Sequence, residues 1–327
     1  MSGSGRELEL VEAFGRHRVL VLGDLILDRY VWGSTERISP EAPVPVVRVD
    51  RESAMLGGAG NVARNLSSLG AQVELVGLVG EDAAAHGIRQ LCDRWKIETR
   101  NLLSDERRPT TQKTRIIALA QQVVRIDRED DEPVRSELVG RLLEGLRASA
   151  PGASGAIVQD YGKGLLAPPL LDEALAIFAE CGVRVFVDPK TPPWRFEGAE
   201  LVKPNLREAE AVAGIRVRGE DDLERLGRRL LQDCRARTLA ITRGPEGMSL
   251  FESGTPTEHV STTPRAVADV AGAGDTAIAA LTLARLSQCE WREAARLANA
   301  AAGVVVEVPG TATVTPEQLV AALGAGP

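Results

Sequence analysis

The sequence has few of the residues that build disulfide frameworks or histidine-rich metal sites. Its 327 residues include four cysteines, which lie far apart with no CxxC pair, and three histidines. Neither a disulfide scaffold nor a zinc cluster is therefore indicated. Apolar runs of membrane-spanning length are also missing, and the N-terminal stretch MSGSGRELEL lacks the apolar core of a signal peptide. These absences predict a cytoplasmic protein with no membrane partner.

Positive charge is in the minority, with 39 Lys and Arg against 46 Asp and Glu and a net charge of −7. This balance argues against a nucleic-acid partner. An anionic ligand must then be held by local chemistry rather than by the overall field. The apolar fraction of 44% is enough for a sizeable core.

Strand-like and helical segments alternate along most of the chain. The strand-like runs are 17–28, 71–82, 155–160, 183–190, 200–205 and 238–244, and the helical patterns include 61–70, 135–149, 168–181 and 220–235. This alternation predicts an α/β fold with a mostly parallel central sheet and helices on both faces. We expect a single domain over residues 1–327.

Two further strand-like stretches have no obvious crossover helix. They lie within residues 36–56 and 110–128, and Pro43 and Pro45 place the first of them at a sheet edge. We predict that they form a small β lid, which covers the site or makes a dimer contact.

Charged and small residues follow several of the predicted strands. They are Gly23-Asp24, 80–82, Gln159-Asp160, 188–190, Asn205 and 242–244. Ligands of open α/β sheets bind beyond the carboxyl ends of the strands. The sequence therefore predicts one polar cleft along that edge.

The segment DVAGAGDT (269–276) places a glycine-alanine turn directly before an alanine-rich helical run. Glycine leaves the backbone amides uncovered, and a helix N-terminus attracts anions. The turn suits a small oxyanion such as a transferring phosphoryl group, and the adjacent Asp275 suits removal of a proton from an attacking hydroxyl. In the alternative interpretation, Asp275 only caps the helix.

This segment resembles the C-terminal signature of the ribokinase-like (PfkB) carbohydrate kinases, DTxGAGD, and residues 57–82 resemble their second glycine-rich segment. The resemblance covers nearly the whole chain. It implies a ribokinase-like fold and a phosphotransferase that uses ATP and Mg²⁺ to phosphorylate a sugar hydroxyl. It also implies that Asp275 is the catalytic base and that the amides of Gly272, Ala273 and Gly274 form the anion hole.

The resemblance extends to residues expected around the nucleotide and its metal ion. KPNLREAE (203–210) matches the family motif Asn-x-x-Glu, so Asn205 and Glu208 are implied to hold the Mg²⁺ shell and the phosphates. The same pair could instead form a helix capping box. Asp269 resembles a residue that helps to hold a monovalent cation such as K⁺. Because Val270 replaces the commoner threonine, such a site would depend on carbonyl oxygens.

Five more positions are nucleotide candidates, and each has a purely structural alternative. Thr242, Gly244 and Gly247 resemble the family's strand–turn–strand near the phosphates or ribose, but could form a plain hairpin. Asn299 resembles a residue of the adenine pocket, but could be a surface asparagine. Lys190 could offer a point charge to the phosphates, or could be a solvated lysine at a strand end.

The implied sugar site begins with Asp24, since the family uses an acid at this position to bind acceptor hydroxyls. Gly57, Gly58 and Asn61 resemble a second part of that site. Asp28 is expected to support it by pairing with Arg29 or Arg37.

Basic residues are candidates for a second phosphate on the sugar. Lys163 lies in the turn QDYGKG (159–164), and Arg115 and Arg125 lie in the predicted lid.

The stretch RISPEAPVPVV (37–47), together with QDYGKG, closely resembles the heptose-7-phosphate kinases of lipopolysaccharide-core biosynthesis. This resemblance implies phosphorylation of D-glycero-D-manno-heptose 7-phosphate at the anomeric O1, which gives the 1,7-bisphosphate. Many relatives carry a C-terminal nucleotidylyltransferase domain with an HxGH-type motif, which is missing here. We therefore expect a separate nucleotidylyltransferase partner, and a homodimer by analogy.

Two other functions remain open from the sequence. The chain could be a ribokinase-like kinase for another sugar, such as ribose, fructose or a hexose phosphate. It could also be a non-catalytic sugar-binding regulator, although Asp275, Asn205 and Glu208 together argue against that. A nicotinamide-dependent dehydrogenase is remote, because no GxGxxG opens a helix after the first buried strand.

Overall fold

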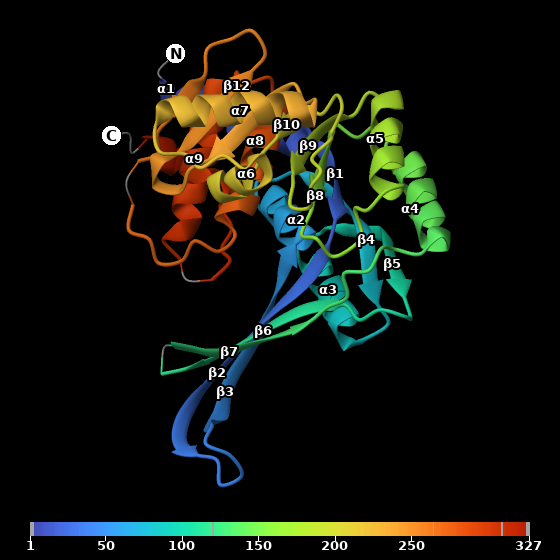
Figure 1. Ribbon diagram of the computed structural model, residues 1–327, viewed down its shortest axis with the longest axis vertical. Helices are drawn as coiled ribbons and strands as arrows, with labels where there is room; N and C mark the ends of the chain where they lie inside the picture. Colours follow the sequence, from blue (N-terminus) through green and yellow to red (C-terminus); the bar gives the residue numbers. More distant parts are fainter. Residues whose placement is uncertain (1–2, 120, 264, 309, 325–327) are drawn as a thin grey trace.

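The computed structural model describes residues 3–119, 121–263, 265–308 and 310–324. They form a body built on a large sheet and an arm made of a smaller sheet that extends away from it (Figure 1). Within the described part of the chain, no helix combines the length and the apolarity needed to cross a bilayer.

The large sheet has nine strands in the order β13-β12-β11-β10-β9-β8-β1-β4-β5. All neighbours from β5 to β11 are parallel, and β12 and β13 are antiparallel additions at one edge. The predicted mostly parallel sheet is confirmed. The strands are β1 (Arg18–Gly23), β4 (Gln72–Gly80), β5 (Glu98–Asp105), β8 (Gly155–Gln159), β9 (Arg184–Asp188), β10 (Leu201–Val202), β11 (Thr238–Thr242), β12 (Met248–Glu252) and β13 (Glu258–Val260).

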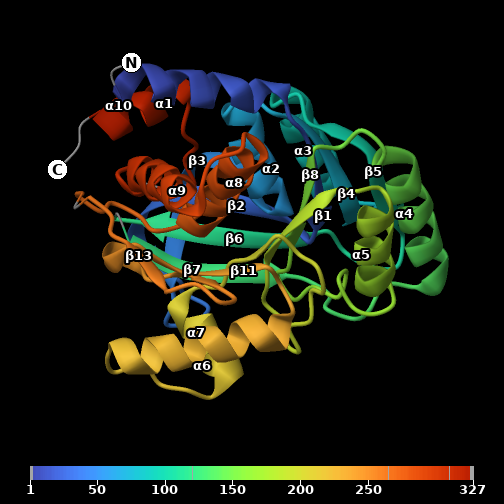
Figure 2. The same cartoon turned by 90° about the horizontal axis from the view of Figure 1, so that it is seen from above.

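Helices cover both faces of this sheet, as predicted (Figure 2). One layer contains α1 (Gly3–Glu12), α2 (Ala59–Ser68), α3 (Ala83–Arg94), α8 (Ala273–Leu286), α9 (Trp291–Val306) and α10 (Pro316–Gly324). The other contains α4 (Ser136–Ser149), α5 (Leu170–Glu180), α6 (Leu206–Ala213) and α7 (Glu220–Cys234). Parallel strands buried on both faces explain why their sequences are continuous apolar runs.

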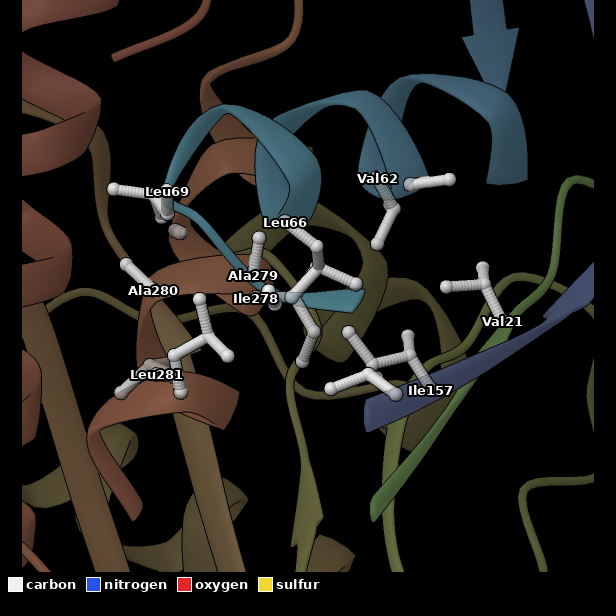
Figure 3. Close-up of a cluster of buried hydrophobic side chains, with 14 of the residues drawn as sticks. Val21, Val62, Leu66, Leu69, Ile157, Ile278, Ala279, Ala280 and Leu281 are labelled. Carbon is white, nitrogen blue, oxygen red and sulfur yellow. The ribbon is translucent and has the colours of Figure 1, made fainter. Parts of the chain in front are cut away.

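The core beneath α2 and α8 fixes the position of the functional helix. Leu66 of α2 and Ile278 of α8 pack over Val21 of β1 and Ile157 of β8 (Figure 3), and all four are fully buried. Each such side chain stabilises the fold by about 1.5–3 kcal/mol through burial. Four alanines of α8 are also buried, and their small side chains let the helix approach the sheet closely; they are Ala277, Ala279, Ala280 and Ala284. The first turn of α8 is thereby held at the carboxyl ends of β8 and β9.

The arm is a four-stranded sheet in the order β3-β2-β6-β7. Its strands are β2 (Leu25–Ile38), β3 (Pro45–Gly58), β6 (Thr111–Ala118) and β7 (Gln121–Arg128). β3, β6 and β7 overlap the two predicted lid segments, and β3 is an edge strand as its prolines indicated.

Two strands depart from the sequence interpretation. The run 17–28 was expected to be one strand, but it divides at Asp24 between β1 of the large sheet and β2 of the arm. Leu22 before that change and Leu25, Ile26 and Leu27 after it are all buried, so hydrophobicity gave no signal. β5 was not predicted, because this edge strand is largely polar and only half-buried.

Candidate active site

The turn before α8 exposes backbone amides at the helix N-terminus. Gly272 has φ +80°, and a Cβ there would lie 2.9 Å from Asn61 Nδ2, so only glycine fits without strain. Ala273 N–H donates to Val270 O at 3.3 Å. Among the described residues, the N–H groups of Gly272, Gly274 and Asp275 have no acceptor. The available donors therefore differ from the predicted set, since Ala273 is engaged and Asp275 contributes its own amide.

Asp275 lies in the first turn of α8 and is 6% exposed. Its Oδ2 accepts a hydrogen bond from Asn61 Nδ2 at 2.6 Å, and its Oδ1 accepts from Tyr161 Oη at 2.9 Å and Gln159 Nε2 at 3.3 Å. The helix N-cap is Gly272 and no side chain caps it. The carboxylate of Asp275 is thus directed to other elements, and the capping alternative does not describe it.

Burial raises the pKa of Asp275 to about 7, an effect that the hydrogen bond from Asn61 partly offsets and the negative charge of Asp188 reinforces. A base with a pKa near neutrality is well matched to accepting a proton from an alcohol. The local structure thus supplies a proton acceptor beside a group of free amides.

A buried network fixes the orientation of Asn61. Arg64 donates to Asn61 Oδ1 at 2.8 Å and to Thr311 O at 2.7 Å, and Asn65 Nδ2 donates to Asn61 O at 2.9 Å. Because Asn61 Oδ1 is held by a guanidinium, its Nδ2 faces Asp275. Asn61 was predicted to bind the sugar, and the structure places its amide on Asp275.

A polar cavity of about 640 Å³ opens beside the turn. It is lined by most of the predicted strand-end residues, and its wall includes Gly272, Gly274 and Asp275. Residues 23–24 and 80–82 do not line it. The strand-end residues that do are Gln159, Asp160, Asp188, Pro189, Lys190, Asn205, Thr242, Arg243 and Gly244.

Asn205 and Glu208 both line this cavity and form the capping box of α6. Asn205 Oδ1 accepts from Glu208 N, and Glu208 Oε2 accepts from Asn205 N, each at 3.0 Å. Lys190 Nζ lies 2.9 Å from Glu208 Oε1. The helix capping box that the sequence offered as the alternative is therefore present. The remaining oxygen lone pairs of Asn205 and Glu208 border the cavity.

Three cavity residues, Gln159, Asp188 and Lys203, had no functional role in the sequence interpretation, although Gln159 and Asp188 were expected to line the cleft. Lys203 is 2% exposed, and its Nζ lies 3.1 Å from Asp188 Oδ2. Gln159 Nε2 lies 3.3 Å from both Asp188 Oδ2 and Asp275 Oδ1, and its Oε1 is buried with no hydrogen-bond donor among the described residues. Burial raises the pKa of Asp188, against the charge of Lys203. These side chains connect the ends of β8, β9 and β10 to Asp275.

A second cavity of about 400 Å³ adjoins the first and shares Thr242, Gly244 and Gly274 with it. Its other walls are mostly small and apolar residues of the segment 262–277 and of α9, which suits a flat aromatic ring. Asn299 lies in this wall and donates to Val260 O at 2.9 Å. Gly247 closes the β11–β12 turn with φ +84°, and a Cβ there would meet Val260 O at 2.1 Å. The hairpin that was the structural alternative for these residues is present, and the same residues also form part of the cavity wall.

Asp24 lies outside both cavities and is 3% exposed. Its Oδ2 accepts from Tyr161 N at 2.9 Å and from Lys163 N at 3.1 Å, and burial raises its pKa to about 6. Asp24 therefore anchors the 159–164 turn that carries Tyr161 to Asp275.

Gly57 and Gly58 allow the end of β3 to pack against the two early acids. A Cβ on Gly57 would meet Asp28 Oδ2, and one on Gly58 would meet Asp24 O. Asp28 pairs with Arg115 at 2.6 Å, so the expected pairing with Arg29 or Arg37 is wrong. Asp28 lies on β2 and Arg115 on β6, and the two residues are close because these strands pair with each other. Gly57 is close to Asp28 because β3 pairs with β2 on its other side.

The remaining predicted phosphate ligands, Lys163 and Arg125, are ion-paired, and Lys113, which was not predicted, lies beside them. Lys163 and Lys113 both contact Glu129 Oε2, at 2.8 and 3.2 Å. Arg125 pairs with Asp127 at 2.9 Å on the exposed β7. Lys113 also pairs with Asp127 at 3.0 Å, so Asp127 joins Arg125 to the same ion-pair network as the two lysines.

The carboxylate of Asp269 is occupied by backbone amides. Oδ1 accepts from Ala271 N at 2.9 Å and Oδ2 from Gly310 N at 3.0 Å. In the part of the chain that the structure describes, no three His, Cys, Asp or Glu side chains converge as a metal-binding group. Asp269 therefore orders the turn before α8.

The amino-acid sequence is similar to a family of carbohydrate kinases and to bifunctional proteins named HldE. Residues 16–318 match the pfkB family of carbohydrate kinases. The chain is 43% identical over 311 residues to the bifunctional protein HldE of Geobacter sulfurreducens, which covers 95% of this chain and 64% of that protein. It is 44% identical over 315 residues to the bifunctional protein HldE of a Caulobacter species, with coverages of 95% and 64%. The chain thus spans less than two thirds of the length of these relatives.

Solved structures share the fold. Ribokinase of Arabidopsis thaliana complexed with ribose and ATP has a TM-score of 0.73 and 20% identity, covering 94% of this chain and 98% of its own. Phosphofructokinase-2 of Escherichia coli in complex with substrates and products has a TM-score of 0.78 and 19% identity, with coverages of 94% and 99%. The ribokinase-like architecture is confirmed.

Proposed function

Because this chain belongs to the pfkB family of carbohydrate kinases, we propose that it transfers the γ-phosphoryl group of ATP to the anomeric hydroxyl of a heptose 7-phosphate. One observation supports the proposed catalytic step most directly. A buried carboxylate with a pKa raised to about 7 lies in the same helical turn as amides that have no acceptor in the described chain.

In this mechanism, the amides of Gly272 and Gly274 bind the transferred phosphoryl group. Asp275 accepts the proton of the sugar hydroxyl as the new O–P bond forms and the bond to ADP breaks. A positioned base contributes about 10²–10⁴-fold to the rate. Positioning and charge stabilisation account for most of the remainder in phosphoryl transfer.

The two adjoining cavities support the placement of the nucleotide. The apolar cavity beside Asn299 would take the adenine, and the polar cavity beside the α8 turn would take the phosphates. Thr242 and Gly244 lie at their junction, where the ribose and α-phosphate would pass. Lys190, on the rim of the polar cavity, would contact a phosphate after leaving Glu208.

The side-chain oxygens that border the polar cavity suit a magnesium ion. Asn205 and Glu208 supply hard oxygen ligands at its wall, and Mg²⁺ is commonly held by one or two carboxylates, phosphates and waters. When bound, the ion neutralises phosphate charge. A K⁺ ion near Asp269 would need backbone carbonyls, because both carboxylate oxygens already accept amide protons.

The heptose phosphate rests on the sequence resemblance, with support from the cations near the 159–164 turn. Lys163 and Lys113 converge on Glu129, an arrangement that a phosphate could take over by displacing the carboxylate. Asp24 positions this turn, and Arg115 would contribute through Asp28. A kinase for another sugar phosphate is the alternative function, since the same pair of lysines would accept its phosphate.

We also propose a homodimer that forms through the arm. Val124 and Ile126 are two positions apart on β7, so their side chains lie on the same face of the strand. They are 45% and 54% exposed. Burying such residues in a partner is favourable. Sedimentation velocity of the wild type and of Ile126→Lys measures the monomer–dimer equilibrium, and a wild-type monomer at micromolar concentration would contradict this proposal.

A panel of acceptors tests the function. Ribose, fructose, fructose 6-phosphate, D-glycero-D-manno-heptose and its 7-phosphate are each incubated with ATP and Mg²⁺, and products are identified by phosphorus-31 NMR. The proposal predicts turnover of the heptose 7-phosphate and a new anomeric phosphate resonance. Preference for an unphosphorylated sugar would refute the heptose-phosphate assignment, and ATP turnover on no acceptor would refute the kinase.

A further inference from the structure

Lys203 is a buried cation in the wall of the polar cavity. It follows β10 and is 2% exposed, whereas Lys190 on the cavity rim has a side chain that is 54% exposed. A Cβ built on Gly274 would lie 3.7 Å from Lys203 Nζ. The ammonium group is therefore close to Gly274, whose amide has no acceptor among the described residues.

The surroundings of Lys203 do not satisfy its charge completely. Its ion-pair partner in the described chain is Asp188, at 3.1 Å, although an ammonium group has three N–H donors. Burying a lysine is costly unless its donors and its charge are compensated. In the part of the chain that the structure describes, two N–H donors of Lys203 thus have no acceptor, at the place where an anion is expected.

The nearby carboxylates explain how the ammonium is held. Asp188 contacts Lys203 and also accepts from Gln159, which in turn donates to Asp275. The positive charge of Lys203 lowers the pKa of both acids against the effect of burial. Lys203 is thereby placed between the end of β9 and the first turn of α8, on the same side as the proton acceptor.

We propose that Lys203 is a catalytic residue that contacts the equatorial oxygens of the transferred phosphoryl group, with Asp188 as its positioning residue. This inference rests on the proposed kinase function. The acceptor hydroxyl gives its proton to Asp275, the acceptor oxygen bonds to phosphorus, and the phosphorus–oxygen bond to ADP breaks. Lys203 keeps its three protons throughout and offsets the negative charge on the phosphoryl oxygens, as other phosphoryl-transfer sites do with a lysine or arginine.

A double-mutant comparison separates this role from simple neutralisation of Asp188. Lys203→Met, Asp188→Asn and the double variant are compared with the wild type in steady-state kinase assays. Lys203→Met is expected to lower kcat by about 10²–10³-fold, the usual cost of losing one charge-stabilising donor. If Lys203 acts on the phosphoryl group, the double variant is at least about tenfold slower than Asp188→Asn alone. A smaller difference overturns the proposal, because neutralising both partners would then have restored the site.

Matched controls keep the result interpretable. Lys190→Met removes the same charge from the exposed rim and is expected to raise KM for ATP more than it lowers kcat. Circular dichroism and ADP affinity check that Lys203→Met is folded.

A binding measurement needs no acceptor sugar. Calorimetry with AMPPNP and ADP gives the ratio of their affinities, which reports contacts to the γ-phosphate. The ratio is expected to fall at least about threefold in Lys203→Met, and an unchanged ratio overturns the inference about Lys203 alone. Absence of wild-type turnover on every acceptor would instead refute the proposed function.

Discussion

Replacing Tyr161 by phenylalanine tests how the protein sets the basicity of Asp275. The tyrosine hydroxyl lies 2.9 Å from Asp275 Oδ1. Burial raises the pKa of Tyr161 well above its ordinary value, so the hydroxyl keeps its proton and acts as a donor. Its hydrogen bond stabilises the ionised carboxylate and lowers the pKa of Asp275. Tyr161→Phe keeps the ring and removes that donor.

The expected size of the effect follows from the energetics of such bonds. A hydrogen bond to a charged group contributes about 1.5–3 kcal/mol, and one pKa unit corresponds to about 1.4 kcal/mol. Because Asn61 and Gln159 remain as donors, we expect a rise of about one unit. With a wild-type pKa of about 7, the ionised fraction at pH 7 falls about fivefold, and at pH 9 it is almost unchanged.

The assay is the pH dependence of kcat/KM for the acceptor, whose acidic limb reports the base of the free enzyme. We expect the limb to move from near pH 7 to near pH 8, with similar plateaus. The chain has two tyrosines, and Tyr30→Phe is the matched control, with no expected shift of the limb. A loss of activity in Tyr161→Phe that is equal at every pH would refute the reasoning, because the hydroxyl would then not act through the ionisation of Asp275.

Three further predictions concern Asp275 and the residues that position it. Asp275→Asn is expected to raise the free energy of unfolding at pH 8 by up to about 4 kcal/mol and to change it little at pH 4, measured by denaturant titration. The sign follows because the folded-state pKa of about 7 exceeds the ordinary aspartate value of 3.8, so ionising the buried acid costs stability as pH rises through this window. Gly272→Ala is expected to lower kcat at least about tenfold, since φ is +80° and the new Cβ would push on Asn61; an unchanged kcat would contradict the assigned geometry. Arg64→Met is expected to release the Asn61 amide and move the acidic limb of the pH profile upward, whereas Arg64→Lys should partly restore it; a limb that stays in place would show that Asn61 is held by other contacts.

The sheet and its helical layers could be predicted because their signals are local. Continuous apolar runs mark strands buried on both faces, and the helices between them have regular apolar spacing. The boundary at Asp24 could not be predicted, because Leu22 and Leu25 are equally apolar although they belong to different sheets. What separates them is pairing with β4 and β8 in one case and with β3 and β6 in the other.

The candidate site was predictable where one short segment carries it. Gly272, Gly274 and Asp275 lie together in the chain, and so do Asn205 and Glu208. Other contacts depend on segments that only the fold brings together. Asn61 is 214 residues from Asp275, and Tyr161 is 114 residues away.

Lys203 and Asp188 were overlooked for a related reason. Each stands in a short polar stretch at a strand end, where a charged side chain is usually solvated. Only their burial and mutual contact at the cavity distinguish them. Sequence patterns locate such residues but do not reveal which of them turn inward.

The most direct test of the mechanism is the turnover of Asp275→Asn at pH 8, compared with that of the wild type under saturating ATP and acceptor. The variant keeps the size of the side chain but cannot accept the hydroxyl proton. We predict that it binds ADP within about threefold of the wild type and that its kcat is lower by at least about 10²-fold. Retention of more than about a tenth of wild-type kcat would contradict the assignment of Asp275 as the base.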